Sequence, residues 1–264
     1  VHSGNNTAIG ALALKATTSG TNNTAVGIDA LTANTTGYDN VAVGRDSLES
    51  NTTGYNNVAV GDRALDSNIS GTHNVAIGSE MVLGANTTGG SNVAIGQNAL
   101  MNNTTANNNV AVGKEAARYG TTASGITAIG FEALNSITTG ASNTVLGYQS
   151  LKDCTTGPQN TAVGALALKS VTTAKENTGH GFEAGSAVTT GDSNTILGFK
   201  SGDALTTGDN NIIIGANAAA SAVGVDNEVT LGDTAITKFR VPGLNFSIKD
   251  STATDNYVLT VDAN

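Results

Sequence analysis

The chain has 264 residues, including 33 glycines and two prolines, with no tryptophan and only 4% aromatic residues. Such small side chains suit thin, tightly stacked layers better than a thick globular core. The formal net charge is −9, and the few Lys and Arg residues are scattered. This excludes a basic patch for a nucleic-acid backbone or a membrane surface. Because no apolar run approaches the roughly 18 residues of a membrane span, we expect no membrane insertion either.

A glycine recurs every 17 residues, from Gly10 to Gly78 and, after a slip of one residue, from Gly96 to Gly232. A repeat this short cannot bury a core alone and must stack on its neighbours. We therefore expect about 13 stacked coils, on the order of 60 Å long at the spacing between strands. The inserted residue lies within residues 79–86 and should bulge from a turn without disturbing the strands. Anchor glycines with an expected structural role are Gly27, Gly44, Gly61, Gly113 and Gly147.

The residues before each anchor glycine predict a short β-strand. Residues 40–44 read Asn-Val-Ala-Val-Gly, so β-branched residues such as Val43 alternate with alanine. That period of two is typical of a strand, and Val60 holds the same place in the next coil. Neither face of this strand is polar, which predicts burial on both sides. Since one thin coil can cover only one face, the other face should contact another chain. The pattern therefore predicts an obligate oligomer.

The rest of each coil carries Ala-Leu and then Thr-Thr-Gly, as at Ala30, Leu31 and residues 35–37. We expect the leucines to form the second wall of the coil. The Thr-Thr-Gly and the following asparagine should form the turn back, with glycine adopting backbone conformations that other residues resist.

Asparagine stands four places before the anchor glycine in most coils, as at Asn40, Asn57 and Asn109. Only Ile126 and Glu228 interrupt the series from Asn6 onward. Side-chain amides stacked in register can hydrogen-bond along the rod, as they do in cross-β stacks. We therefore expect these asparagines to be structural.

The Asn-[Thr/Val]-Ala-[Val/Ile]-Gly repeats of residues 1–232 resemble those of trimeric autotransporter adhesin heads. The resemblance implies an all-β fold, a left-handed parallel β-roll or β-solenoid whose three chains pack around one axis. The 17-residue period is longer than is common in those heads, so their turn geometry does not carry over. Residues 1–10 already match a repeat in register, which predicts that the chain begins inside a longer protein.

Residues 229–243 resemble the segment that follows such repeats in bacteriophage tail fibres, especially those of cyanophages. We expect a repeat shaft over residues 1–232 and a capping or connecting β segment over residues 233–264, with irregular strands at residues 239–248 and 257–261. The resemblance implies a homotrimeric tail fibre of the virion that contributes to host attachment. Its partners would be two further copies, other tail or baseplate proteins, and a host-surface glycan or protein. The alternative is the head of a trimeric adhesin on a bacterial cell surface.

Catalytic and cofactor-binding patterns are not found. The three histidines, His2, His73 and His180, fall in different coils, so no catalytic triad can be nominated. Asp192 and Asp209 lie near glycines, as does Asp203, but the calcium-binding pattern of β-helix repeats is absent. We expect neither a cofactor nor enzymatic activity.

Two single residues leave alternatives open. His180 replaces the usual Ile, Val or Leu before an anchor glycine, beside Gly179 in place of alanine. It is either a buried neutral histidine satisfied by a backbone group or water, or one of three imidazoles that meet on a three-fold axis and hold a metal or an anion. Cys154, the one cysteine, is either a tolerated small residue or an interchain bridge.

Two other classes of solenoid are less favoured. An ice-binding solenoid displays regularly spaced threonines on a flat face, but Thr35 and Thr36 are adjacent and cannot both point outward from one sheet. A polysaccharide-degrading solenoid needs paired carboxylates on a groove built by inserted loops, and the chain has almost no insertions.

Overall fold

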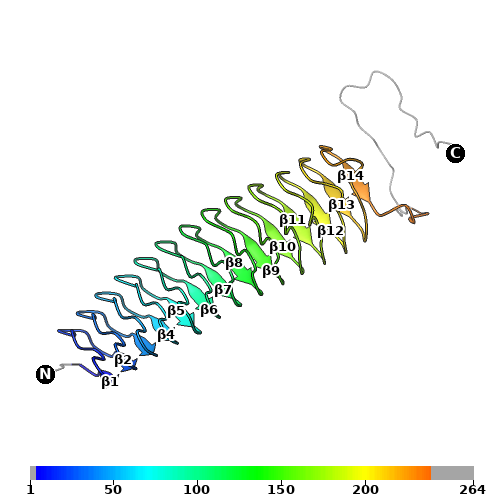
Figure 1. The fold of residues 1–264 in the computed structure, drawn as a ribbon. Helices are drawn as coiled ribbons and strands as arrows, with labels where there is room; N and C mark the ends of the chain where they lie inside the picture. The colour runs from blue at the N-terminus through cyan, green and yellow to red at the C-terminus, as the bar shows by residue number, and fades with distance from the viewer. Residues whose placement is uncertain (1–3, 239–264) are drawn as a thin grey trace, which may run out of the picture. The chain divides into compact units, whose positions relative to one another are not determined.

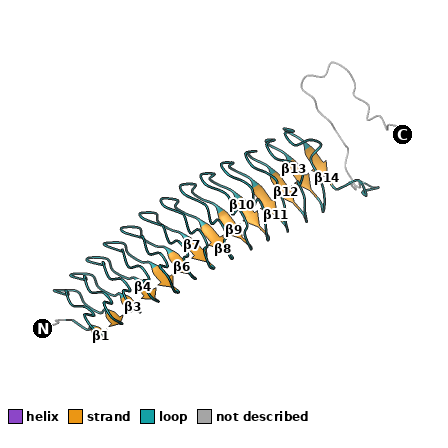
Figure 2. Cartoon of the chain, in the orientation of Figure 1, coloured by secondary structure: helices purple, strands orange, loops and turns teal. Residues whose placement is uncertain are grey.

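The computed structural model describes residues 4–238, which contain fourteen short strands and no helix (Figures 1 and 2). The strands form one parallel sheet in sequence order. Their bounds are β1 (Thr7–Ile9), β2 (Thr24–Val26), β3 (Val41–Val43), β4 (Val58–Val60), β5 (Val75–Ile77), β6 (Val93–Ile95), β7 (Val110–Val112), β8 (Thr127–Ile129), β9 (Thr144–Leu146), β10 (Thr161–Val163), β11 (Thr178–His180), β12 (Thr195–Leu197), β13 (Ile212–Ile214) and β14 (Val229–Leu231).

Each strand pairs with the equivalent strand of the next coil, as in Val41↔Val58 and Val43↔Val60. The chain is therefore a parallel β-solenoid, as the 17-residue period predicts. The inserted residue leaves this register intact, because β5 and β6 pair in line across 18 residues, Val75 opposite Val93. The extra length lies before Val82, whose carbonyl accepts the Leu65 N–H, and both Glu80 and Met81 have positive φ. The expected bulge in a turn is confirmed.

The core of each coil lies between the middle residue of the strand and a leucine on the opposite wall. Ala42 in β3 and Leu48 behind it are both fully buried, and the same pair recurs at Ala59 and Leu65. The sequence alone left open which strand face turns inward. Alanine does so because the leucine from the other wall already fills the thin interior, and close packing leaves no room for a second large side chain.

The leucines of this wall have a left-handed backbone, with φ of 52° at Leu31 and 51° at Leu48. This conformation costs a non-glycine residue roughly 1–2 kcal/mol. Full burial of a leucine side chain contributes about 1.5–3 kcal/mol, which offsets that strain. The leucine wall is therefore held by its packing against the alanines rather than by local backbone preference.

The anchor glycines are required by both backbone conformation and space. Gly44 has φ of +138°, and a Cβ there would lie 2.2 Å from the carbonyl oxygen of Gly61 in the next coil. Gly113 has φ of +133°, with Gly130 O at 2.4 Å from such a Cβ. At these glycines the backbone lies too close to the next coil for any side chain. The same holds at Gly27, Gly61 and Gly147.

The glycine of the Thr-Thr-Gly turn has a different role from the expected one. Gly37 is not among the residues with positive φ; the left-handed residue of this turn is Asp39, with φ of 55°. Gly37 is needed because a Cβ would lie 2.4 Å from Gly54 O and 2.3 Å from Asn34 Oδ1. The expectation of an unusual glycine conformation here is wrong, and close approach between coils is the physical reason for the glycine.

The predicted asparagine ladder is confirmed and runs through the interior. Asn57 Oδ1 accepts the Asn74 backbone N–H at 3.0 Å and the Asn74 side-chain amide at 3.2 Å. Asn57 Nδ2 donates to Asn40 Oδ1 at 3.1 Å and to Gly71 O at 2.9 Å. All these asparagine side chains are buried. At the interruption, Asn109 Oδ1 still accepts the backbone N–H of Ile126.

A second buried ladder runs beside the first in the N-terminal half. Each Nδ2 donates to Oδ1 of the preceding member at 2.8–2.9 Å, along Asn34, Asn51, Asn68, Asn86 and Asn103. Asn103 Oδ1 ends the ladder without a hydrogen-bond partner, because Gly120 follows in the column. Beyond it the column is apolar and includes Ile137, Cys154 and Val171, all fully buried.

Of the described residues, 4–233 belong to one compact unit and 234–238 to a second. Of the second unit, the structure describes residues 234–238, which are exposed. The strands expected at residues 239–248 and 257–261 lie outside the described residues.

Candidate functional site: the outward face of the sheet

The first and third residues of the strands point away from the core and form two parallel columns along the sheet. We call this surface the strip. In β3, Val41 and Val43 are half-buried while Ala42 between them is fully buried, and β4 with Val60 repeats the pattern. The alternation follows from the strand itself, in which successive side chains point to opposite faces. The predicted structural valines Val43 and Val60 therefore belong to the strip and not to the core.

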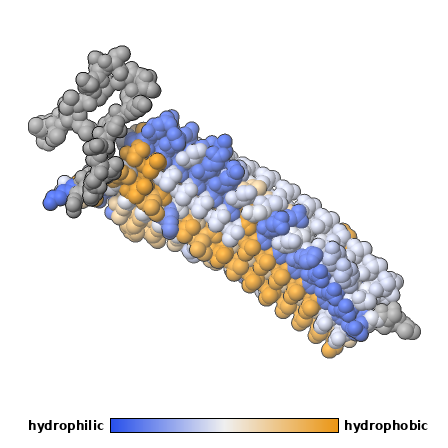
Figure 3. All heavy atoms as spheres, turned by 180° about the vertical axis from the view of Figure 1, so that it is seen from behind, coloured by the Kyte–Doolittle hydropathy of each residue, from blue (hydrophilic) through white to orange (hydrophobic). Residues whose placement is uncertain are grey.

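The strip is mostly apolar. Its third column is Val, Ile or Leu in every described strand except β11, which has His180, and its first column is Val or Ile in seven strands and Thr in the other seven. Figure 3 shows a continuous hydrophobic band along one side of the coils. Nine of its large side chains are 37–63% exposed: Ile9, Ile77, Ile95, Leu146, Leu197, Ile212, Ile214, Val229 and Leu231. A monomeric soluble protein seldom exposes so long an apolar surface.

The column after the anchor glycines borders the strip and changes character along the rod. In the N-terminal half it includes an ion pair: Arg45 Nε lies 2.9 Å from Asp62 Oδ1, and this hydrogen bond raises the pKa of Arg45. In the C-terminal half it carries stacked, exposed rings, with Phe131 and Tyr148 centroids 5.5 Å apart. Phe182 and Phe199 form a second such pair at 5.5 Å. Aromatic side chains thus widen the apolar surface toward its C-terminal end.

His180 lies in the strip as the third residue of β11, between Val163 of β10 and Leu197 of β12. Its side chain is exposed in the single chain. In the single chain, His180 therefore does not lie in the interior of its coil. The inward residue of this strand is Gly179, and the neighbouring Leu168 fills its space, since a Cβ on Gly179 would lie 2.6 Å from Leu168 Cγ.

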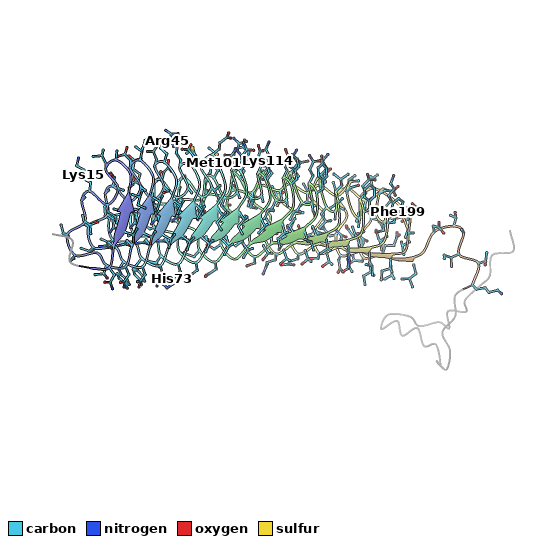
Figure 4. All side chains as sticks on the ribbon, turned by 90° about the horizontal axis from the view of Figure 1, so that it is seen from below. Lys15, Arg45, His73, Met101, Lys114 and Phe199 are labelled. Carbon is cyan, nitrogen blue, oxygen red and sulfur yellow. The ribbon has the colours of Figure 1, made fainter. Side chains whose placement is uncertain are left out.

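His73 lies elsewhere. Its ring nitrogen Nε2 is 3.1 Å from Asn56 Nδ2, and its ring meets Tyr55 edge-on with centroids 5.4 Å apart. Figure 4 places it on the side of the rod opposite Arg45 and Lys114. The structure does not bring His73 and His180 together, and His2 lies outside the described residues.

The cysteine and the aspartates have structural surroundings. Cys154 is fully buried, and desolvation raises the pKa of its thiol to about 11. Because the thiol is inaccessible, the structure favours the interpretation of Cys154 as a tolerated small residue over the alternative of an interchain bridge. Asp192 and Asp209 share one exposed column, where Asp209 Oδ1 accepts the Asp192 N–H at 2.7 Å. Asp203 lies in another column. Among residues 4–238 no group of three potential metal ligands occurs within one chain.

The paired threonines divide into one bonded and one exposed column. Thr35 Oγ1 donates to Thr52 O of the next coil at 3.0 Å, while Thr36 is exposed. Only the second threonine of each pair is therefore displayed, as the adjacent spacing predicts. No helix in the described part of the chain is long and apolar enough to cross a membrane.

The fold defines a class: the protein is a parallel β-solenoid repeat protein whose distinguishing surface is the apolar strip. In comparisons with known proteins, the chain matches no protein-family model, no curated protein and no solved structure.

Proposed function

We propose that this protein is the shaft of a homotrimeric fibre, in which the strips of three chains pack against one another around a common axis. The observation that carries the proposal is the strip itself, which carries Val, Ile or Leu on every described strand except β11. The strip repeats once per coil along the rod. A second copy of the chain has the same repeat distance, so its strip can match this surface coil by coil. Closed cyclic symmetry then places equivalent coils side by side.

The size of the strip also favours this arrangement. Two columns over fourteen strands cover a band about 60 Å long and roughly 10 Å wide, on the order of 600 Å² per chain. Three such strips together bury on the order of 1,800 Å² in the trimer, shared among three pairwise contacts, and totals of about 1,200–2,000 Å² are typical of specific interfaces. Burial of that area would offset the cost of association through the hydrophobic effect.

As to its setting, we assign the fibre to a phage tail, where it projects from the virion and contributes to attachment to a host-surface glycan or protein. The support is the likeness of residues 229–243 to the segment that follows such repeats in tail fibres. A bacterial adhesin head would use the same strip in the same way. In either setting the rod is a spacer, because its coils carry almost no inserted loops.

Sedimentation equilibrium of the chain tests the proposal. The expected mass is three times the 26.2 kDa of one chain. Val60→Arg with Val112→Arg should dissociate the assembly, since both side chains lie in the strip. The matched control is Thr53→Arg with Thr105→Arg, on exposed turns outside the strip, which should remain trimeric. A stably folded wild-type monomer would overturn the proposal.

A further inference from the structure

We propose that the His180 imidazoles of three copies converge into one binding site for a divalent transition-metal ion of the zinc class. The site rests on the proposed trimer, because each chain supplies a single ligand. It differs from the trimer interface in general, since it assigns a chemical role to one coil. Within the described strands, His180 is the only strip residue with a nitrogen or sulfur ligand atom in its side chain.

The position of His180 in the strip favours convergence. The third column is the more uniformly apolar of the two, with Val, Ile or Leu in every other strand, whereas the first column includes threonines. The driest column of a trimer is the one nearest its axis, so we place the third column there. Because equivalent coils lie at the same level in a cyclic assembly, the three His180 side chains then face one another.

The side chains paired with His180 in the sheet offer its ring no polar partner. Val163 and Leu197 lie directly above and below it in the sheet. No strip residue is Asp, Glu, Lys or Arg. An imidazole ring nitrogen supplies a lone pair to a metal ion. A shared ion gives all three lone pairs a partner that the apolar neighbours cannot provide.

The donor set also selects the kind of ion. Imidazole nitrogen suits zinc, copper and nickel, with Zn–N distances of about 2.0–2.1 Å. Calcium and magnesium prefer oxygen ligands, and the strip offers no carboxylate. Three histidines leave a fourth position of a tetrahedral zinc ion open to water.

The test uses the whole chain without a histidine tag, first dialysed against EDTA. Sedimentation equilibrium establishes the oligomeric state without metal. Zinc binding is then measured by titration calorimetry, and coordination by the visible absorption of added Co²⁺. We expect one ion per three chains in the wild type and in the control His73→Ala, whose ring lies in a turn outside the strip. His180→Val, which restores the residue type of the other coils, should remain trimeric and lose this binding.

The outcomes separate the two proposals. A metal-free trimer that binds zinc at one ion per three chains, or a trimer that forms only with zinc and not in His180→Val, supports the site. Three outcomes overturn the site and leave the fibre intact. They are a trimer that binds no zinc, a trimer that binds one ion per chain, and a His180→Val trimer that binds zinc as well as the wild type does. A folded monomer both with and without zinc overturns the fibre and the site together.

Discussion

Ile196 occupies the space that Gly185 leaves open in the preceding coil: a Cβ on Gly185 would lie 2.8 Å from Ile196 Cδ1. Gly185 stands where most coils have the wall leucine, and Ile196 stands where most have the inward alanine. In this pair the large side chain comes from the strand and the small residue stands in the leucine wall, the reverse of the usual arrangement. The interior therefore remains filled. From the other side Leu168 fills the space beside Gly179, so both neighbouring coils pack into this one.

This reversed arrangement predicts strong coupling between two substitutions. Ile196→Ala alone should destabilise the protein by about 2–5 kcal/mol, because it leaves a cavity beside Gly185 and Gly202. Gly185→Leu alone should overpack the same space and cost about 1–3 kcal/mol. The double variant fills the space beside Gly185 from the leucine wall instead of from β12, and it should be more stable than the sum of the single effects implies. Denaturant unfolding of all four proteins measures the coupling, and simple additivity would contradict the reversed arrangement.

The anchor glycine of the seventh coil should not tolerate even one added methyl group. Gly113→Ala forces a Cβ to within 2.4 Å of Gly130 O at a φ of +133°. We expect a loss of at least about 2 kcal/mol from strain and displaced backbone. Thermal melting at fixed protein concentration measures it.

The matched control for that substitution is Gly125→Asn, one turn further along the chain. Gly125 has φ of +68° with only Ser142 Oγ at 3.9 Å from an added Cβ. The equivalent Asn108, with φ of 60°, already has this conformation in the preceding coil. Gly125→Asn should change stability by less than about 1 kcal/mol. Equal losses in both glycine variants would mean that closeness between coils is not what selects Gly113.

Removal of one ladder amide should cost more than removal of an exposed one. Asn57→Ala leaves the Asn74 N–H and the Gly71 carbonyl without partners in the interior. We expect destabilisation of about 2–3 kcal/mol, the penalty for buried unpaired polar groups. The side chain of the adjacent Asn56 is exposed and hydrogen-bonds to His73. Asn56 has φ of 56° and the equivalent Asp39 has φ of 55°, so Asn56→Asp removes an exposed amide at a backbone conformation that aspartate already adopts. Asn56→Asp should therefore change the melting temperature little, and a similar shift in both variants would argue against the ladder as a stabilising element.

The Cys154 thiol should be unreactive in the native rod. Desolvation raises its pKa to about 11, so at pH 8 it is a neutral, inaccessible thiol. We expect maleimide or Ellman's reagent to label Cys154 only after unfolding, whereas Thr156→Cys, at an exposed turn position, should react at once.

The same raised pKa has a pH consequence. The folded chain holds the thiol proton more tightly than the unfolded chain, whose thiol has an ordinary pKa of about 8.5. This contribution to stability is complete below that pH and is lost as the pH rises toward about 11. Cys154→Val, which matches Val171 in the same buried column, should lack this loss while remaining as stable at pH 7. In the labelling experiment, rapid reaction of Cys154 in the native protein would contradict its burial. In the pH experiment, an equal loss of stability in Cys154→Val at high pH would show that the thiol is not its cause.

The period made much of this fold predictable. Glycine recurs at the coil position of Gly113, and asparagine recurs at that of Asn57. The contacts of these two residues with the next coil could therefore be inferred from the sequence. The inward direction of Ala42 could not, because both faces of its strand are apolar and only the position of Leu48 decides between them. The asparagines of the ladder that includes Asn51 also follow the repeat spacing. Because this series ends at Asn103, the pattern is shorter and less conspicuous in the sequence than that of the first ladder. The exposure of His180 follows from the alanine facing inward.

Backbone hydrogen bonds between coils run nearly parallel to the rod, as in Gly44 N–H to Val26 O and Val41 N–H to Asn57 O. Tension applied to the two ends of a chain therefore loads these bonds one coil at a time instead of all together. Each coil that opens releases 17 residues, an added contour of about 55 Å when the chain is extended. A single chain pulled lengthwise should thus lengthen in many small, equal steps at modest force. Such stepwise unfolding would dissipate the energy of a sudden load while the chain stays covalently intact.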